Sequence, residues 1–128
     1  MADTFTLDLR RFGEKTEKQM SQIVRKICLD LFTLIVTRSP VDTGRFRANN
    51  SINLKTLPSD STLEIDKSGG MTLRKGNSAL VSYNLGDTVF IYNNVEYAMY
   101  LEFGPHSKQA PSGVYRVSVQ EIISKWGQ

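Results

Sequence analysis

The chain has 128 residues, a length that suits a single domain over residues 1–128 with its own hydrophobic core. Its 40% hydrophobic and 23% charged residues are typical of a globular protein and exclude wholesale disorder. The 16 Lys and Arg residues against 13 Asp and Glu residues give a net charge of +3, far from the dense positive charge of a histone-like DNA-binding protein.

The most regular hydrophobic pattern predicts a long helix over residues 16–38. Its apolar side chains recur every three or four residues and so share one face. They are Met20, Ile23, Val24, Ile27, Leu31, Leu34 and Ile35. Pro40 ends this helix, because the residue before a proline disfavours helical dihedral angles. Residues 1–12 alternate apolar and polar side chains as far as Leu9, which predicts an N-terminal arm or a short lead-in helix.

A tight turn is predicted at residues 40–44 (PVDTG), because proline fixes one dihedral angle and Asp and Gly tolerate unusual ones. Asp42 or Thr43 would then cap a single helical turn through Phe46 and Ala48.

The middle of the chain predicts an antiparallel sheet. Residues 51–57 alternate as in a half-buried strand, and residues 88–92 are apolar enough for a central strand. Between them, residues 58–87 are poor in core side chains, but Leu63 and Ile65 alternate with acidic residues and a glycine pair then predicts a turn. We therefore expect about four or five strands, with residues 58–87 forming an extended hairpin that protrudes from the core.

Two further helices are predicted near the C-terminus. In residues 97–103, Tyr97, Tyr100 and Leu101 share one face of a short helix. After a loop, a last helix carries apolar side chains at helical spacing, namely Tyr115, Val119, Ile122 and Trp126. The predicted fold class is α+β: a long N-terminal helix packed on an antiparallel β-sheet, with a protruding hairpin and a C-terminal helix.

Residues that carry catalytic chemistry are sparse, and the sequence predicts no enzyme. One histidine, His106, and one cysteine, Cys28, exclude a multi-histidine metal site, a structural zinc site and an internal disulfide. Cys28 lies in an apolar helical stretch and is expected to pack as a small hydrophobic residue in a protein made in a reducing compartment. No phosphate-binding glycine pattern, secretory signal or apolar run of roughly 18 residues occurs. We expect no cofactor, metal, small-molecule substrate or membrane partner.

Positive charge is concentrated between residues 10 and 55, which face a polyanion or form a solvated helix face. Arg45 and Arg47 flank Phe46, an arrangement that can contact phosphate and stack on a base. The favoured interpretation is that Phe46 packs inward while both arginines are solvated or pair with acids such as Asp42, because no recognition-helix or sheet-face pattern accompanies them. A small basic nucleic-acid-binding module is the alternative function that this region leaves open.

Two motifs occur in order along the chain: PVDTG at residues 40–44 after the long helix, and EYAMYLEFGPHSKQAPSG at residues 96–113 before the last helix. Together they resemble the neck or tail-completion (head–tail joining) family of long-tailed bacteriophages. The candidate turn or assembly residues that match its pattern are Pro40, Asp42, Thr43, Gly44, Tyr97, Glu102 and Gly104. The chain departs from the pattern at Asn50, where the family often has an aromatic residue, and residues 58–87 have no recognisable counterpart.

The resemblance implies a virion structural protein of the neck or tail, made in the cytoplasm of the bacterial host. Such proteins form a ring, often with six-fold symmetry, that joins the tail to the head connector around the DNA channel. Expected partners are therefore further copies of the chain, other neck, tail or connector proteins, and non-specific DNA.

Particular residues gain expected roles from this resemblance. Arg45 and Arg47 are expected to line the channel or a subunit contact, and residues 58–87 to reach a neighbouring ring. Glu102 is expected to hold the turn at residues 42–44 by accepting backbone N–H bonds. Maintenance of the fold is the other explanation for the two motifs.

Overall fold

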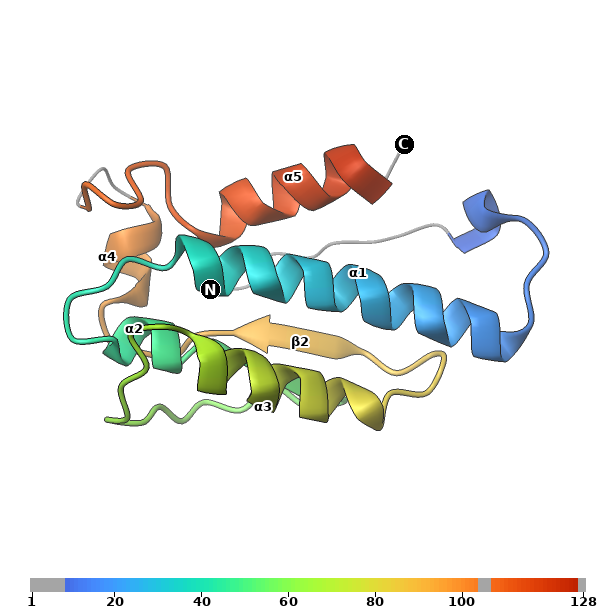
Figure 1. The fold of residues 1–128 in the computed structure, drawn as a ribbon, viewed down its shortest axis with the longest axis horizontal. Helices are drawn as coiled ribbons and strands as arrows, with labels where there is room; N and C mark the ends of the chain where they lie inside the picture. The colour runs from blue at the N-terminus through green and yellow to red at the C-terminus, as the bar shows by residue number, and fades with distance from the viewer. Residues whose placement is uncertain (1–8, 104–106, 127–128) are drawn as a thin grey trace.

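The computed structural model describes residues 9–103 and 107–126, and it has an α+β fold (Figure 1). In chain order the elements are η1 (Leu9–Phe12), α1 (Glu17–Arg38), α2 (Arg45–Ala48), β1 (Ser51–Leu54), α3 (Gly70–Val81), β2 (Val89–Tyr92), α4 (Ala98–Glu102) and α5 (Tyr115–Trp126). The helix α1 runs through the middle of the molecule, with α5 on one side and the sheet and α3 on the other. The predicted α+β class, long N-terminal helix, antiparallel sheet and C-terminal helix are confirmed.

The helix α1 is closed at its N-terminus by side chains of its own sequence. Thr16 Oγ1 accepts the Gln19 N–H at 3.1 Å, and Gln19 Oε1 accepts the Thr16 N–H at 3.0 Å, which is a capping box. The predicted helix over residues 16–38 therefore differs from α1 only in including Thr16, which is the capping residue. None of the helices in the described part of the chain is long and apolar enough to cross a membrane.

Two hydrophobic clusters hold the elements on α1. The first joins α1 to α2, α4 and α5 through Ile27, Leu31, Ile35, Phe46, Val95, Ala98, Ala110, Val114, Tyr115 and Ile122. The second lies between α1, β1 and α3 and consists of Phe32, Val36, Ile52 and Leu80. The helix α3 approaches α1 closely because Gly76 has no side chain: a Cβ there would lie 2.3 Å from Cε2 of Phe32.

The prediction of an extended hairpin at residues 58–87 was wrong, as was that of about four or five strands. Within residues 9–103 and 107–126 the sheet has two strands, β1 and β2, paired antiparallel from Ser51↔Tyr92 to Leu54↔Val89. The second half of the supposed hairpin is the helix α3, and residues 55–69 contain neither helix nor strand.

The helix α3 begins where a turn was predicted because Asp66 binds its first turn. Asp66 accepts the N–H groups of Gly69 at 3.1 Å and Thr72 at 2.8 Å, together with the Thr72 hydroxyl at 2.7 Å. Burial of Leu80 against α1 then stabilises the helix. Leu63 and Ile65, whose alternation suggested a strand, are 82% and 61% exposed and face no sheet.

The short elements agree with the predictions in type but differ in detail. The single turn α2 begins after Gly44, and Thr43, one of the two predicted capping residues, accepts the Arg45 N–H at its start through Oγ1 at 3.2 Å. The helix α4 occupies the predicted short helix at residues 97–103. The predicted N-terminal arm at residues 1–12 is represented by η1, and the rest of it lies outside the described residues.

Candidate functional site

The turn at residues 40–44 and the described residues of the second motif, 96–103 and 107–113, lie at the same end of the molecule, where α2, α4 and the start of α5 gather (Figure 1). The side chain of Gln109 connects them, because its Oε1 accepts the Val41 N–H at 2.9 Å and its Nε2 donates to Val41 O at 3.0 Å. The turn at residues 40–44 is thus tied to the loop that leads into α5. Gly104, the last candidate residue, lies outside the described residues.

The turn at residues 40–44 packs against the chain just before α3. Gly44 has φ +97°, a left-handed conformation that glycine adopts without strain, and a Cβ there would lie 2.9 Å from Lys67 N. Gly44 O accepts the Asp66 N–H at 3.0 Å. Asp42 at the tip is exposed, whereas Pro40 is half-buried. The need for glycine at this turn is therefore structural.

Arg45 joins three segments of the chain through its guanidinium group. Nη1 and Nη2 bind the two carboxylate oxygens of Glu96 at 2.7 and 3.1 Å, and Nε donates to Thr62 O at 3.0 Å. The same group lies 5.9 Å from the ring centre of Tyr97, which in turn packs against the buried ring of Phe46. Tyr97 is therefore part of the support for Arg45.

Arg47 closes the C-terminal end of α1. Its Nη2 donates to Thr37 O at 3.1 Å and to Ser39 O at 2.8 Å, and its Nη1 donates to Lys67 O at 2.6 Å. A cation is favoured there because the free carbonyl groups carry the negative end of the helix dipole.

The favoured interpretation of residues 45–47 was that Phe46 packs inward while the arginines are solvated or pair with acids, and these contacts agree with it in outline. Phe46 is buried and Arg45 pairs with an acid, although the acid is Glu96 rather than Asp42. Both guanidinium groups are already bonded to acceptors of the same chain. A contact of either arginine with DNA or with another subunit stays a prediction.

Glu102 is a buried carboxylate that anchors the start of α5. The side chain is 2% exposed; its Oε1 accepts the N–H groups of Val114 and Tyr115, and its Oε2 that of Arg116, each at 2.9 Å. The Arg116 guanidinium also donates to Oε2 at 3.1 Å and to Glu102 O. Gly113, with φ +86°, makes room, since a Cβ there would lie 2.7 Å from Glu102 O.

The prediction that Glu102 holds the turn at residues 42–44 was therefore wrong, because Glu102 holds the start of α5 instead. The carboxylate accepts backbone N–H bonds as expected, but α4 places it beneath the N-terminus of α5, where free N–H groups and the positive end of the helix dipole favour an anion. Burial would by itself raise the pKa of Glu102, but bonds from the N–H groups and the Arg116 side chain outweigh it, so the pKa lies below 4.5.

A buried polar network around Asn50 was not predicted. Asn50 Nδ2 donates to Ser39 Oγ at 2.7 Å and to Arg47 O at 3.2 Å, and its Oδ1 accepts bonds from the Tyr115 hydroxyl at 2.7 Å and Asn93 Nδ2 at 3.1 Å. Burial raises the pKa of Tyr115 well above 10.0, so its hydroxyl keeps the proton that it donates. The one sequence signal was the departure at Asn50 from an expected aromatic residue.

The described residues offer little that resembles a catalytic centre. Burial raises the pKa of the Cys28 thiol to about 11, which makes it a poor nucleophile. No group of three or more His, Cys, Asp or Glu residues within residues 9–103 and 107–126 is placed to hold a metal ion. An open groove of about 330 Å³ beside Trp126 is lined by Lys15, Gln19, Gln22, Ile23 and Lys26.

Large hydrophobic side chains are instead exposed in three parts of the described chain, namely at Met71, Val81 and Leu85 on or just after α3, and on two surfaces of three residues each. The first, which we call the ridge, consists of Leu57, Leu63 and Ile65 in the irregular segment before α3. The second, which we call the α4 face, consists of Met99, Tyr100 and Phe103. Large apolar side chains gathered on an exposed surface are typical of contacts with other proteins.

Comparison with known proteins adds a family. Residues 3–104 match the family described as "Bacteriophage HK97-gp10, putative tail-component". The matched region contains the turn at residues 40–44 and the whole of α4, and it ends before α5. No curated protein and no solved structure matches the chain.

Proposed function

The chain belongs to the HK97-gp10-like family of bacteriophage tail components, and we propose that it is the tail-completion or neck component that joins the tail to the head connector. In this role several copies, expected to be six, form a ring around the channel through which the DNA passes. Membership of this family implies a place in the virion, with other phage structural proteins as partners.

The observation that carries this proposal is the pair of exposed hydrophobic surfaces, the ridge and the α4 face. A ring of identical subunits requires each subunit to present two different surfaces that fit each other, whereas a two-fold dimer requires only one. The ridge and the α4 face lie on different segments of the chain, and the large side chains of both are at least half exposed.

The chemistry of the chain supports a structural protein rather than an enzyme. Its buried carboxylate, Glu102, is occupied in holding α5, and its thiol is largely buried. The arginines that suggested a nucleic-acid-binding module, Arg45 and Arg47, each make several bonds within the chain. No observation favours that alternative over the tail component.

Disrupting the gene in a phage that encodes this chain tests the proposal. We expect filled heads and separate tails to accumulate unjoined, and we expect the wild-type chain supplied from a plasmid to restore joined, infectious particles. Electron micrographs of the lysate give the numbers of unjoined heads and tails and of joined particles. Joined particles at normal yield without the chain would refute the proposed role.

A further inference from the structure

The ridge is an ordered segment, although it contains neither helix nor strand. The Thr62 N–H donates to Asn49 Oδ1 at 2.9 Å, and Thr62 O accepts a bond from Asn49 Nδ2 at 3.0 Å. Asn94 Nδ2 donates to Pro58 O at 2.8 Å at the start of the segment, and Asp66 N–H donates to Gly44 O at 3.0 Å at its end. These bonds fix the backbone while Leu63 and Ile65 face outward. The apolar side chains are thus presented in a fixed arrangement.

The α4 face is equally well supported from behind. Ala98 and Glu102 on the inner side of α4 are buried, and Glu102 bonds the helix to the start of α5. On the outer side Phe103 is half exposed, and the Arg116 guanidinium lies 4.5 Å from the centre of its ring. A cation therefore borders the exposed aromatic ring.

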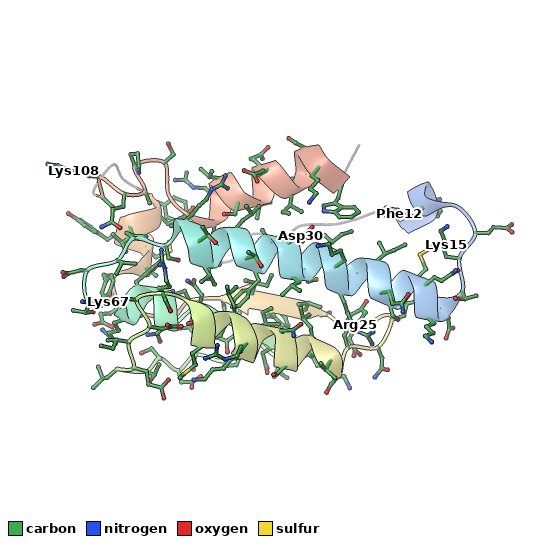
Figure 2. All side chains as sticks on the ribbon, viewed as in Figure 1. Phe12, Lys15, Arg25, Asp30, Lys67 and Lys108 are labelled. Atoms are coloured by element: carbon green, nitrogen blue, oxygen red, sulfur yellow. The ribbon has the colours of Figure 1, made fainter. Side chains whose placement is uncertain are left out.

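The two surfaces carry opposite charges. Between residues 57 and 66 the sequence contains Asp60, Glu64 and Asp66 but no Lys or Arg. Between residues 98 and 116 the cations Lys108 and Arg116 accompany one acid, the buried Glu102, which is ion-paired with Arg116, so this span keeps a net positive charge of one. Figure 2 shows Lys108 pointing away from the molecule at the end where α4 lies.

The ion pair of Glu64 with Lys75 does not cancel this difference. The side chain of Glu64 is 60% exposed and that of Lys75 is 63% exposed. Ion pairs between side chains this exposed contribute little to stability. Glu64 is therefore free to exchange its partner at low energetic cost.

Charge also selects the geometry of association. If the ridge of one copy met the ridge of another, acids would face acids, and two α4 faces would bring cations together. Contact of a ridge with an α4 face pairs opposite charges around an apolar centre. Figure 1 shows α4 above α2 and the segment 55–69 running below it, so the two surfaces are presented by different parts of each copy.

We infer that the ridge of one copy, Leu57, Leu63 and Ile65, packs on the α4 face of the next copy, Met99, Tyr100 and Phe103. Asp60 and Glu64 then meet Lys108 and Arg116 around the apolar contact. This inference rests on the proposed ring and names the surfaces that close it. Since the contact is head-to-tail, its repetition does not end at a dimer, and it gives a ring when the rotation from copy to copy closes.

Cysteine cross-linking tests this contact on the full chain. In the double variant Leu63→Cys with Met99→Cys, a short bismaleimide is expected to give a covalent ladder that ends at the closed ring. Either single variant should stay at the mass of one chain, because its new thiol has no partner across the contact. The natural thiol of Cys28, whose pKa is raised to about 11 by burial, should react slowly.

The matched control is Val81→Cys with Met99→Cys, since Val81 is an exposed apolar residue on α3 outside the ridge. This pair should give no ladder. A covalent dimer from Leu63→Cys alone would overturn the inference in favour of a two-fold contact. A chain that forms an oligomer by light scattering but gives no ladder would overturn the inference and leave the proposed ring standing. Absence of both oligomer and ladder would overturn the two together.

Discussion

Replacing Asn50 by leucine is expected to lower the free energy of unfolding by about 3–5 kcal/mol, the largest effect of any single substitution that we consider. The side chain of Asn50 bonds Ser39, Asn93 and Tyr115, all of which are buried. Leucine has the same branched shape but leaves these polar groups without their partner. Each buried polar group left unbonded costs about 1–3 kcal/mol. Urea denaturation followed by circular dichroism measures the change.

The same substitution at an exposed asparagine provides the control. Asn77→Leu on α3 changes the same chemistry where water remains available, so its effect should stay within about 0.5 kcal/mol. Tyr115→Phe removes only one bond of the network and should cost about 1 kcal/mol. If Asn50→Leu and Asn77→Leu had equal effects, the network would not be a source of stability.

Replacing Glu102 by glutamine is expected to cost about 2–4 kcal/mol at neutral pH and little in acid. Glutamine keeps the shape of the side chain but loses the charge that binds Arg116 and the N-terminus of α5. Because the pKa of Glu102 is lower in the folded chain than its ordinary value of 4.5, its contribution is complete above that value. The contribution disappears as the pH falls through the lower, folded pKa.

The difference between the two proteins should therefore shrink as the pH falls below about 4.5. Urea denaturation at pH 7 and at about pH 3 measures it, and the wild-type chain alone should lose this part of its stability in acid. Glu64→Gln is the control, because its exposed pair with Lys75 should be worth less than about 0.5 kcal/mol at either pH. A constant difference between wild type and Glu102→Gln across this range would show that charge is not what Glu102 contributes.

The elements that were correctly predicted are those whose signals are local. The apolar spacing of residues 16–38 and the proline after it define α1 without reference to the rest of the chain. The helix α3 was missed because its sequence is rich in residues of low helix propensity, and because Gly69 before it and Gly70 at its start form a glycine pair, which is common in turns. Asp66, which caps it, was the available signal.

The number of strands depended on contacts between distant segments. Residues 62–66 alternate like a strand, but Thr62 and Asp66 bond to Asn49 and Gly44, and these bonds hold the segment away from the sheet. Alternation of side chains indicates only that a segment suits extended backbone. It does not indicate which strand, if any, lies beside it.

The candidate site was predicted in its parts but not in its connections. The turn glycine, the short helix and a carboxylate that accepts N–H bonds were all expected, yet the partner of Glu102 depends on how α5 is placed over α4. The role of Asn50 likewise depends on the meeting of α1, α5 and both strands, since its partners Ser39, Asn93 and Tyr115 are far apart in sequence. No spacing rule along the chain reveals such a meeting point.

The absolute mass of the purified chain in solution tests the proposed ring most directly. Light scattering coupled to size-exclusion chromatography, across a series of protein concentrations, gives this mass without assumptions about shape. We predict one discrete oligomer of about six chains, as expected for a closed ring. A mass equal to that of one chain at every concentration would contradict the proposed ring. A mass that grows without limit as the concentration rises would also contradict it.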